Sequence, residues 1–200
     1  MPRSDVFAAL SGGLVGQGRD TSDYDLNPGT MLPPGRTLRN AAVLIGFQPG
    51  RDGLHVILTK RASHLKHHPG QIALPGGKQD DGDRDATATA LREAREEIGL
   101  RPDQVRVIGA LAPHETITGF VITPVLAEID PLFTPTRQEA EVDEVFRAPY
   151  AHVCDPVNFH VESRVWRGVR RHYYTVPYGP YYIWGATARI LRALADRVAE

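Results

Sequence analysis

A helix enclosed by glycine-containing turns limits what this chain can fold into more than any other feature. It lies between Pro75-Gly76-Gly77 and Gly99, and glycine readily takes the left-handed conformation that ends helices. Residues three and four apart are neighbours on a helix. One side carries the acidic group Glu93, Glu96 and Glu97, and the other carries the stripe Thr87, Leu91, Ala94 and Ile98. We therefore predict a helix that packs on a sheet and presents concentrated negative charge on its other face.

The three glutamates repel one another unless a cation lies among them. Carboxylate oxygens suit hard divalent cations, and Mg²⁺ commonly bridges between protein carboxylates and substrate phosphates. The acidic face therefore predicts a site for Mg²⁺ or Mn²⁺. A solvated helix face is the alternative, because runs of charge are usually exposed. The glycines at both ends and the motif upstream favour the metal site.

Residues 92–100 resemble the second half of the Nudix hydrolase signature, G-x5-E-x7-R-E-U-x-E-E-x-G-U, where U is apolar. The loop that leads to Arg92 is one residue longer than in the signature, so Asp83 or Arg84 takes the place of its first glutamate. The resemblance implies an α/β fold, the Nudix-type α/β/α sandwich with a mixed sheet. The metal ligands that it implies are Glu93, Glu96, Glu97 and the backbone of Gly77. Arg92 would orient the glutamates, and its pairing with Glu96 four residues later fits helical geometry.

The segment from Leu58 to Gly77 is similar to the motif of the coenzyme A pyrophosphatase subgroup, which contains L-L-T-x-R and ends in G-Q-x-x-F-P-G-G. Leu74 stands where the subgroup usually has phenylalanine. The similarity covers most of the chain from about Leu38 onward. Substrate-binding residues that it suggests are Arg61, Lys66, His68 and Gln71. Arg61 and Lys66 suit phosphate groups, although two exposed cations would give the same pattern.

A second acidic cluster lies between Arg137 and Phe146. In many Nudix relatives an acid on this side of the sheet approaches the metals or activates water, and Glu144 matches that position best. An exposed acidic loop is an equal alternative. The residues expected to take part in catalysis are Arg92, Glu96, Glu97 and Glu144. The tyrosines between positions 173 and 182 would stack on adenine, line a pantetheine channel or simply pack in core strands.

Length and composition predict one domain at residues 38–200, preceded by an irregular N-terminal arm at residues 1–37. The net charge of -1 gives no reason to expect nucleic-acid binding. The apolar run after Met1 is too short for a signal or a membrane span, so we expect a cytoplasmic protein without a membrane partner. Cys154 is the single cysteine, which excludes an intramolecular disulfide, and we expect it to be buried or inert.

The remaining pattern predicts a mixed sheet. Residues 41–47 and 55–59 read as a hairpin, and 105–111 and 120–129 as further strands, with Pro124 favouring an edge or a bulge. Residues 171–176 and 181–184 are expected to pair around a Pro-Tyr-Gly-Pro turn. The C-terminal segment reads as a helix that buries Ile190, Leu191, Leu194 and Val198 and pairs Arg192 with Asp196.

The resemblance implies a divalent-metal-dependent pyrophosphohydrolase that cleaves coenzyme A or its thioesters to 3′,5′-ADP and 4′-phosphopantetheine. One alternative is an enzyme for another nucleoside diphosphate derivative, such as ADP-ribose or NADH. Another is a Nudix-fold module that senses a nucleotide without cleaving it, which the intact Arg92-Glu93 and Glu96-Glu97 pairs disfavour. The expected partner is a small molecule of the coenzyme A class. The sequence leaves open whether the chain is a monomer or a homodimer.

Overall fold

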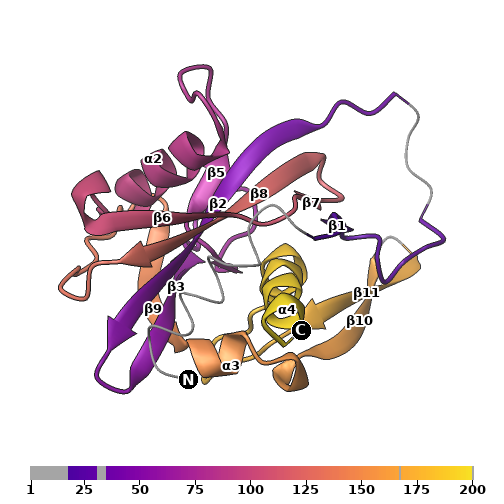
Figure 1. The fold of residues 1–200 in the computed structure, drawn as a ribbon. Coiled ribbons are helices and arrows are strands. Elements are labelled where there is room, and N and C mark those ends of the chain that lie inside the picture. The colour runs from indigo at the N-terminus through magenta and orange to yellow at the C-terminus, as the bar shows by residue number, and fades with distance from the viewer. Residues whose placement is uncertain (1–17, 31–34, 167, 200) are drawn as a thin grey trace.

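The computed structural model describes residues 18–30, 35–166 and 168–199. These residues form a mixed nine-stranded sheet with helices on both faces, and a separate two-stranded ribbon (Figure 1). The predicted α/β sandwich with a mixed sheet is confirmed. Within the described ranges, no helix is both long and apolar enough to cross a membrane.

Strand β2 (Arg39–Gly50) is the centre of the sheet. It pairs in parallel with β8 (Phe120–Ile129) and in antiparallel with β3 (Gly53–Arg61), which confirms the predicted hairpin. The smaller strands around them are β1 (Thr21–Ser22), β4 (Ile72–Ala73), β5 (Gly76–Lys78), β6 (Val105–Ala110), β7 (His114–Glu115) and β9 (Val142–Pro149). β5, which contains Gly76 and Gly77 of the glycine turn, pairs with β2. β9, which contains Glu144 of the second acidic cluster, pairs with β3.

Helix α2 (Ala86–Ile98) covers one face of the sheet. Its first turn is capped by Asp85, whose Oδ1 accepts a hydrogen bond from the Ala88 N–H at 2.8 Å. It ends at Gly99, which has the left-handed φ of 72° that the sequence predicts. Ala94 and Ile98 of the predicted stripe are buried against the sheet.

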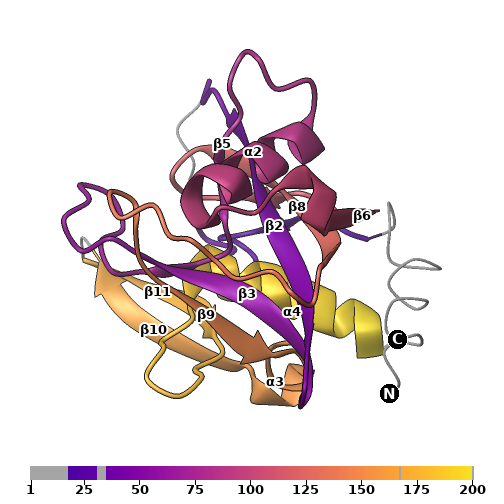
Figure 2. The same ribbon diagram turned by 90° about the vertical axis from the view of Figure 1, so that its left-hand side faces the viewer.

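Helix α4 (Gly185–Ala199) covers the opposite face (Figures 1 and 2). The predicted burial of Ile190, Leu191 and Leu194 is confirmed, and Val198 packs against the same core. Arg192 Nε donates to Asp196 Oδ1 at 2.7 Å, as the spacing predicts. Beside α4 lies the short helix α3 (Tyr150–Val153), which Cys154 follows as a buried thiol, as expected.

The predicted pairing around the Pro-Tyr-Gly-Pro turn is confirmed in part, because antiparallel bridges join Thr175 to Trp184 and Tyr178 to Tyr181 across it. The main partner of β11 (Val169–Thr175) is β10 (His160–Trp166), which the sequence pattern did not predict. β10 is almost entirely exposed, so it lacks the apolar alternation that would have indicated a strand. Pro124 lies inside the sheet, where its missing N–H faces the gap between the end of β6 and the start of β7.

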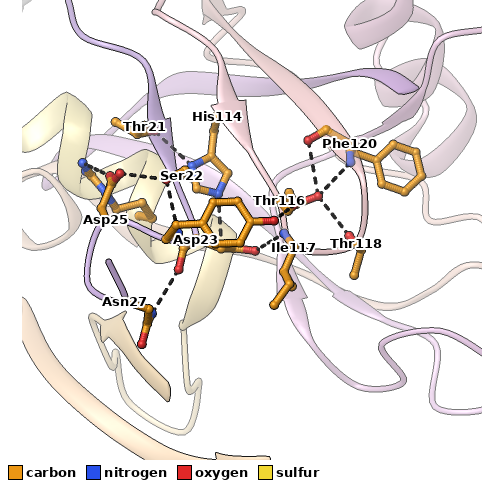
Figure 3. A network of polar contacts seen from close by, with 12 residues as sticks. Thr21, Ser22, Asp23, Asp25, Asn27, His114, Thr116, Ile117, Thr118 and Phe120 are labelled. Carbon is orange, nitrogen blue, oxygen red and sulfur yellow. Dashed lines mark hydrogen bonds and ion pairs between the residues drawn. The ribbon is translucent and has the colours of Figure 1, made fainter. Parts of the chain in front are cut away.

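Residues 18–30 lie against the domain through a polar network (Figure 3). Thr21 starts β1, which is parallel to β7, and its hydroxyl contacts the buried His114 Nδ1 at 3.0 Å. His114 Nε2 is 3.3 Å from Asp23 Oδ1. Further along, Asp25 pairs with Arg189 of α4 at 2.7 Å, and Asn27 bonds the backbone of β11. This part of the predicted arm is therefore irregular apart from β1, and the remainder falls partly outside the described residues.

Candidate active site

Arg92 lies at the centre of the acidic face of α2. Its Nη1 donates to Glu93 Oε1 at 3.0 Å and to Glu96 Oε2 at 2.9 Å, which confirms the predicted pairing across one turn. Its Nη2 donates to the Lys78 carbonyl at 3.0 Å, at the end of β5. One guanidinium thus fixes two glutamates relative to the glycine turn, because its planar fork offers donors in several directions.

The loop before α2 contributes a third carboxylate to Arg92. Asp83 accepts from Arg92 Nε at 3.1 Å and from Nη2 at 2.9 Å. The guanidinium lowers the pKa of Asp83 to about 2. Arg84 is exposed and pairs with Asp85. Of the two residues that the longer loop left open, Asp83 is the one that joins the acidic face.

Glu97 lies where α2 meets the sheet, and only 4% of it is exposed. Its Oε2 accepts a hydrogen bond from the Gly76 N–H at 3.2 Å. Burial raises the pKa of this carboxyl to about 8, with smaller contributions in the same direction from Glu93 and Glu141. Burial also raises the pKa of the half-buried Glu93. For both carboxyl groups, the nearby positive charge therefore does not offset the cost of burying the ionised form.

The two glycines of the turn are required by the close approach of α2 and β2. A Cβ added to Gly77 would lie 2.4 Å from Glu93 Oε1, and one added to Gly76 would lie 2.3 Å from the Ala42 carbonyl oxygen. Gly76 also has a φ of 156°, which side chains rarely adopt. The turn therefore has no side chains because carboxylates and backbone occupy the space that they would fill.

Arg61, the last residue of β3, faces the same side of the sheet as α2. Its positive charge lowers the pKa of Glu97, against the stronger effect of burial. Its Nε is buried and has no hydrogen-bond partner among the described residues. The guanidinium is thus placed beside the acidic helix with a donor left over, which suits a phosphate oxygen.

These residues fit the divalent metal that the acidic face predicts. Glu93 and Glu97 are desolvated carboxylates with raised pKa values, Glu96 is an exposed one, and Gly77 leaves room beside Glu93. Hard oxygen donors of this kind suit Mg²⁺ or Mn²⁺. In the described part of the chain the side chains do not themselves converge into a closed group of three or more ligands.

A cavity of about 520 Å³ lies at the end of β3, on the face of the sheet opposite to α2. Lys60 lines it, and strand alternation explains why Lys60 and Arg61 point to opposite faces. The cavity is lined by Lys60, Pro69, Gly70, Gln71, Ile72, Glu144, Pro180, Tyr181, Tyr182 and Trp184. Half of these residues belong to the segment from Leu58 to Gly77 that suggested the substrate. The predicted substrate residue Gln71 lies here, whereas Lys66 and His68 are exposed in the loop that precedes it.

Glu144 belongs to the cavity rather than to the acidic helix. It is paired with Lys60 across β3 and β9, and it accepts a short hydrogen bond from the Tyr181 hydroxyl. The Tyr181 ring stacks on Phe146 with centroids 3.6 Å apart, which fixes the position of that hydroxyl. Glu141, three residues earlier in the same acidic cluster, is the member whose negative charge raises the pKa of Glu93 and Glu97.

Sequence reasoning did not single out Lys60, preferred Glu144 to Glu141 within the second acidic cluster, and left the role of Asp83 open. Lys60 could have been found from the alternation of β3, had the strand been extended to Arg61. Asp83 is nine residues from Arg92, and Glu141 reaches α2 through the fold. Neither spacing is a helical repeat, so the sequence carried no local signal for these two acids.

An acidic helix that is held by an arginine, follows two glycines and packs on a mixed sheet is a candidate site for metal-dependent hydrolysis. A model of the NUDIX domain matches residues 27–165, and the chain belongs to the Nudix hydrolase family. Members of this family use divalent metal ions and act on small molecules such as nucleotide derivatives.

Relatives named Nudix hydrolase NudL, described as uncharacterized, span most of the chain. The one from Enterobacter sp. strain 638 is 42% identical over 164 residues, which is 80% of this chain and 83% of the relative. The one from Salmonella paratyphi B is 40% identical over 189 residues, 90% and 96% of the two chains. The crystal structure of the Nudix hydrolase RenU of M. smegmatis has a TM-score of 0.50 at 24% identity, covering 60% of this chain and 83% of that one. That likeness concerns the fold alone.

Proposed function

We propose that this Nudix hydrolase cleaves the pyrophosphate bond of coenzyme A or its thioesters, releasing 3′,5′-ADP and 4′-phosphopantetheine. The observation that carries the proposal is the end of β3. There the segment that resembles the coenzyme A pyrophosphatase motif supplies Arg61 beside the acidic helix and Lys60 and Gln71 in the cavity. A substrate that has a bulky group attached to a pyrophosphate needs a metal site for the pyrophosphate and an adjacent cavity for the bulky group.

Glu93, Glu96 and Glu97, with the backbone of Gly77, would hold the divalent metal. When bound, the metal neutralises the pyrophosphate and lowers the pKa of the attacking water. Arg92 fixes Glu93 and Glu96 in place through its two hydrogen bonds. Arg61 offers its unused Nε–H to a phosphate oxygen. Water attacks one phosphorus atom, the bridging P–O bond breaks, and the two halves of the substrate separate.

We assign the proton of the attacking water to a glutamate of α2 rather than to Glu144. Glu144 was the alternative base, but it faces the cavity and its carboxylate is engaged by Tyr181. A general base has to come within hydrogen-bond reach of the water that it activates. Glu144 is better placed to orient the substrate, together with Lys60 opposite it on β3.

Two other functions remain to be tested against this proposal. Hydrolysis of ADP-ribose or NADH would use the same acidic helix, and the cavity would then hold a ribose or nicotinamide. A sensor that binds without cleaving would need no desolvated metal ligands, whereas this chain keeps Glu93 and Glu97 partly or fully buried beside Arg92. The acidic helix therefore favours an enzyme over a sensor.

The decisive experiment is a product assay with Mg²⁺ and with Mn²⁺. The substrates are coenzyme A, acetyl-coenzyme A, dephospho-coenzyme A, ADP-ribose and NADH, and the products are identified by chromatography. We expect 3′,5′-ADP from coenzyme A with the highest kcat/KM in the panel. Faster cleavage of ADP-ribose or NADH would overturn the proposed substrate. A lack of turnover on all five, with a bound nucleotide, would favour the sensor.

A further inference from the structure

The ribbon of β10 and β11 carries two arginines directly opposite each other. Arg164 and Arg171 are cross-strand partners, so their side chains share one face of the ribbon. Like charges in this position destabilise a strand pair. Among the described residues neither guanidinium has a carboxylate within ion-pair distance, and Arg171 Nε is buried without a hydrogen-bond partner. The pair therefore has the features of an anion site.

Aromatic rings hold both guanidiniums from one side. Arg164 Cζ lies 5.9 Å from the centre of the Trp184 ring, and Arg171 Cζ lies 5.0 Å from that of Trp166. Cation–π contacts of this kind orient a guanidinium while its N–H groups stay available for another acceptor. The rings thus support the two cations without neutralising them.

The arginine face is continuous with the cavity at the end of β3. Trp184, which contacts Arg164, also lines the cavity and lies 5.2 Å from the Tyr173 ring of β11. Tyr182, another lining residue, donates its hydroxyl to Glu162 of β10 at 2.7 Å. A ligand in the cavity can therefore extend along aromatic side chains toward the two arginines.

We propose that Arg164 and Arg171 bind a terminal phosphate monoester at the end of the substrate away from the bond that is cleaved. This proposal rests on the proposed function, and in coenzyme A the group is the 3′-phosphate of the ADP half. Arg61 is already committed to the acidic helix, so recognition of a second phosphate requires other cations. Two guanidiniums suit a dianionic phosphate, which accepts bidentate hydrogen bonds. The adjoining adenine lies against Trp184 and Tyr182.

The first test measures binding of the two nucleotide products without any turnover. Isothermal titration compares 3′,5′-ADP with 5′-AMP for the wild type, Arg171→Met and Arg164→Met. The matched control is Arg170→Met on the opposite face of the ribbon, where Arg170 bonds Ser163. We expect the wild type to prefer 3′,5′-ADP, and each arginine-face variant to lose at least tenfold in affinity for it while 5′-AMP changes less than twofold. The control keeps the preference.

Equal binding of the two nucleotides by the wild type, or equal losses for both in the variants, overturns the phosphate site. Arg164 is exposed, so its variant remains informative even if Arg171→Met fails to fold. Kinetics with coenzyme A and dephospho-coenzyme A separate this proposal from the proposed function. Hydrolysis of coenzyme A with no effect of either arginine on the preference refutes the site alone. Loss of the 3′,5′-ADP preference in the variants of a chain that does not cleave coenzyme A supports the site and refutes the proposed function.

Discussion

Replacing Glu97 by glutamine should change how the stability of the metal-free protein depends on pH. Burial raises the pKa of the folded-state carboxyl to about 8, from an ordinary value of 4.5. Between these values the folded chain holds a proton that the unfolded chain has released, so the free energy of unfolding falls as pH rises. The slope is about 1.4 kcal/mol per pH unit. The contribution is complete below pH 4.5 and is lost on passing pH 8, a change of about 5 kcal/mol.

Glutamine can still accept a hydrogen bond from the Gly76 N–H, but it cannot ionise. The free energy of unfolding of the Glu97→Gln protein should therefore not fall over this pH range. For a chain of 200 residues, about 5 kcal/mol corresponds to roughly 10–20 °C in Tm. Relative to the wild type, the variant should therefore gain about 4 kcal/mol, or roughly 8–16 °C in Tm, between pH 5 and pH 8.5. The assay is thermal unfolding followed by circular dichroism in EDTA. Glu96→Gln is the matched control, because Glu96 is an exposed carboxylate on the same helix and should follow the wild type.

Addition of Mn²⁺ at pH 8 should then restore the stability of the wild type and leave Glu97→Gln nearly unchanged. Binding of the metal to the ionised carboxylate favours the deprotonated form, so metal binding at pH 7 should release protons. Calorimetry in buffers of different ionisation enthalpy measures that release. Parallel stability curves for the wild type and Glu97→Gln across this pH range would refute the reasoning, since they would mean that Glu97 is not desolvated.

Four further substitutions test the remaining assignments. Glu93→Gln should lower kcat with Mn²⁺ by about a hundredfold or more, with an unchanged or higher metal-free Tm because repulsion is relieved. Gly77→Ala brings a methyl group against Glu93 and should weaken Mn²⁺ binding in a titration, whereas Gly82→Ala, which meets open space, should not. Arg61→Met should lower kcat/KM equally for coenzyme A and dephospho-coenzyme A, and a loss confined to coenzyme A would contradict its place at the pyrophosphate. Glu144→Gln should raise KM and keep the pH profile of kcat, and loss of a pH limb would make it the base.

The acidic helix could be predicted from the sequence because its signals are local. Gly99 and the spacing of Arg92 and Glu96 act within a few residues, and the structure agrees with both of them. The burial of Glu97 was not predictable in this way. It depends on Gly76 of β5, which is 21 residues away and is placed there by its pairing with β2. Tertiary packing thus decided which of three similar glutamates is desolvated.

The cavity shows where the sequence pattern was insufficient. Of the residues that the motif suggested, Gln71 lines the cavity, whereas Lys66 and His68 do not, and the cationic side chain in the lining is that of Lys60. A motif gives residue types in order, but only the strand fixes the face to which each one points. Strand β10 of the ribbon was missed for a different reason, although residues 171–176 were predicted as a strand. The residues of β10 are almost all exposed, so no hydrophobic period distinguishes them from a loop.

The contacts of residues 21–27 affect the order in which the chain completes its fold. Thr21 contacts a histidine 93 positions later, Asn27 bonds a residue 145 positions later, and Asp25 pairs with Arg189, 164 positions later. Domains generally form as the chain is synthesised, beginning at the N-terminal end. Here the contacts of residues 21–27 cannot all form until α4 has left the ribosome, because Asp25 pairs with Arg189. A segment that is made before the sheet is therefore held in place by elements that are made after it.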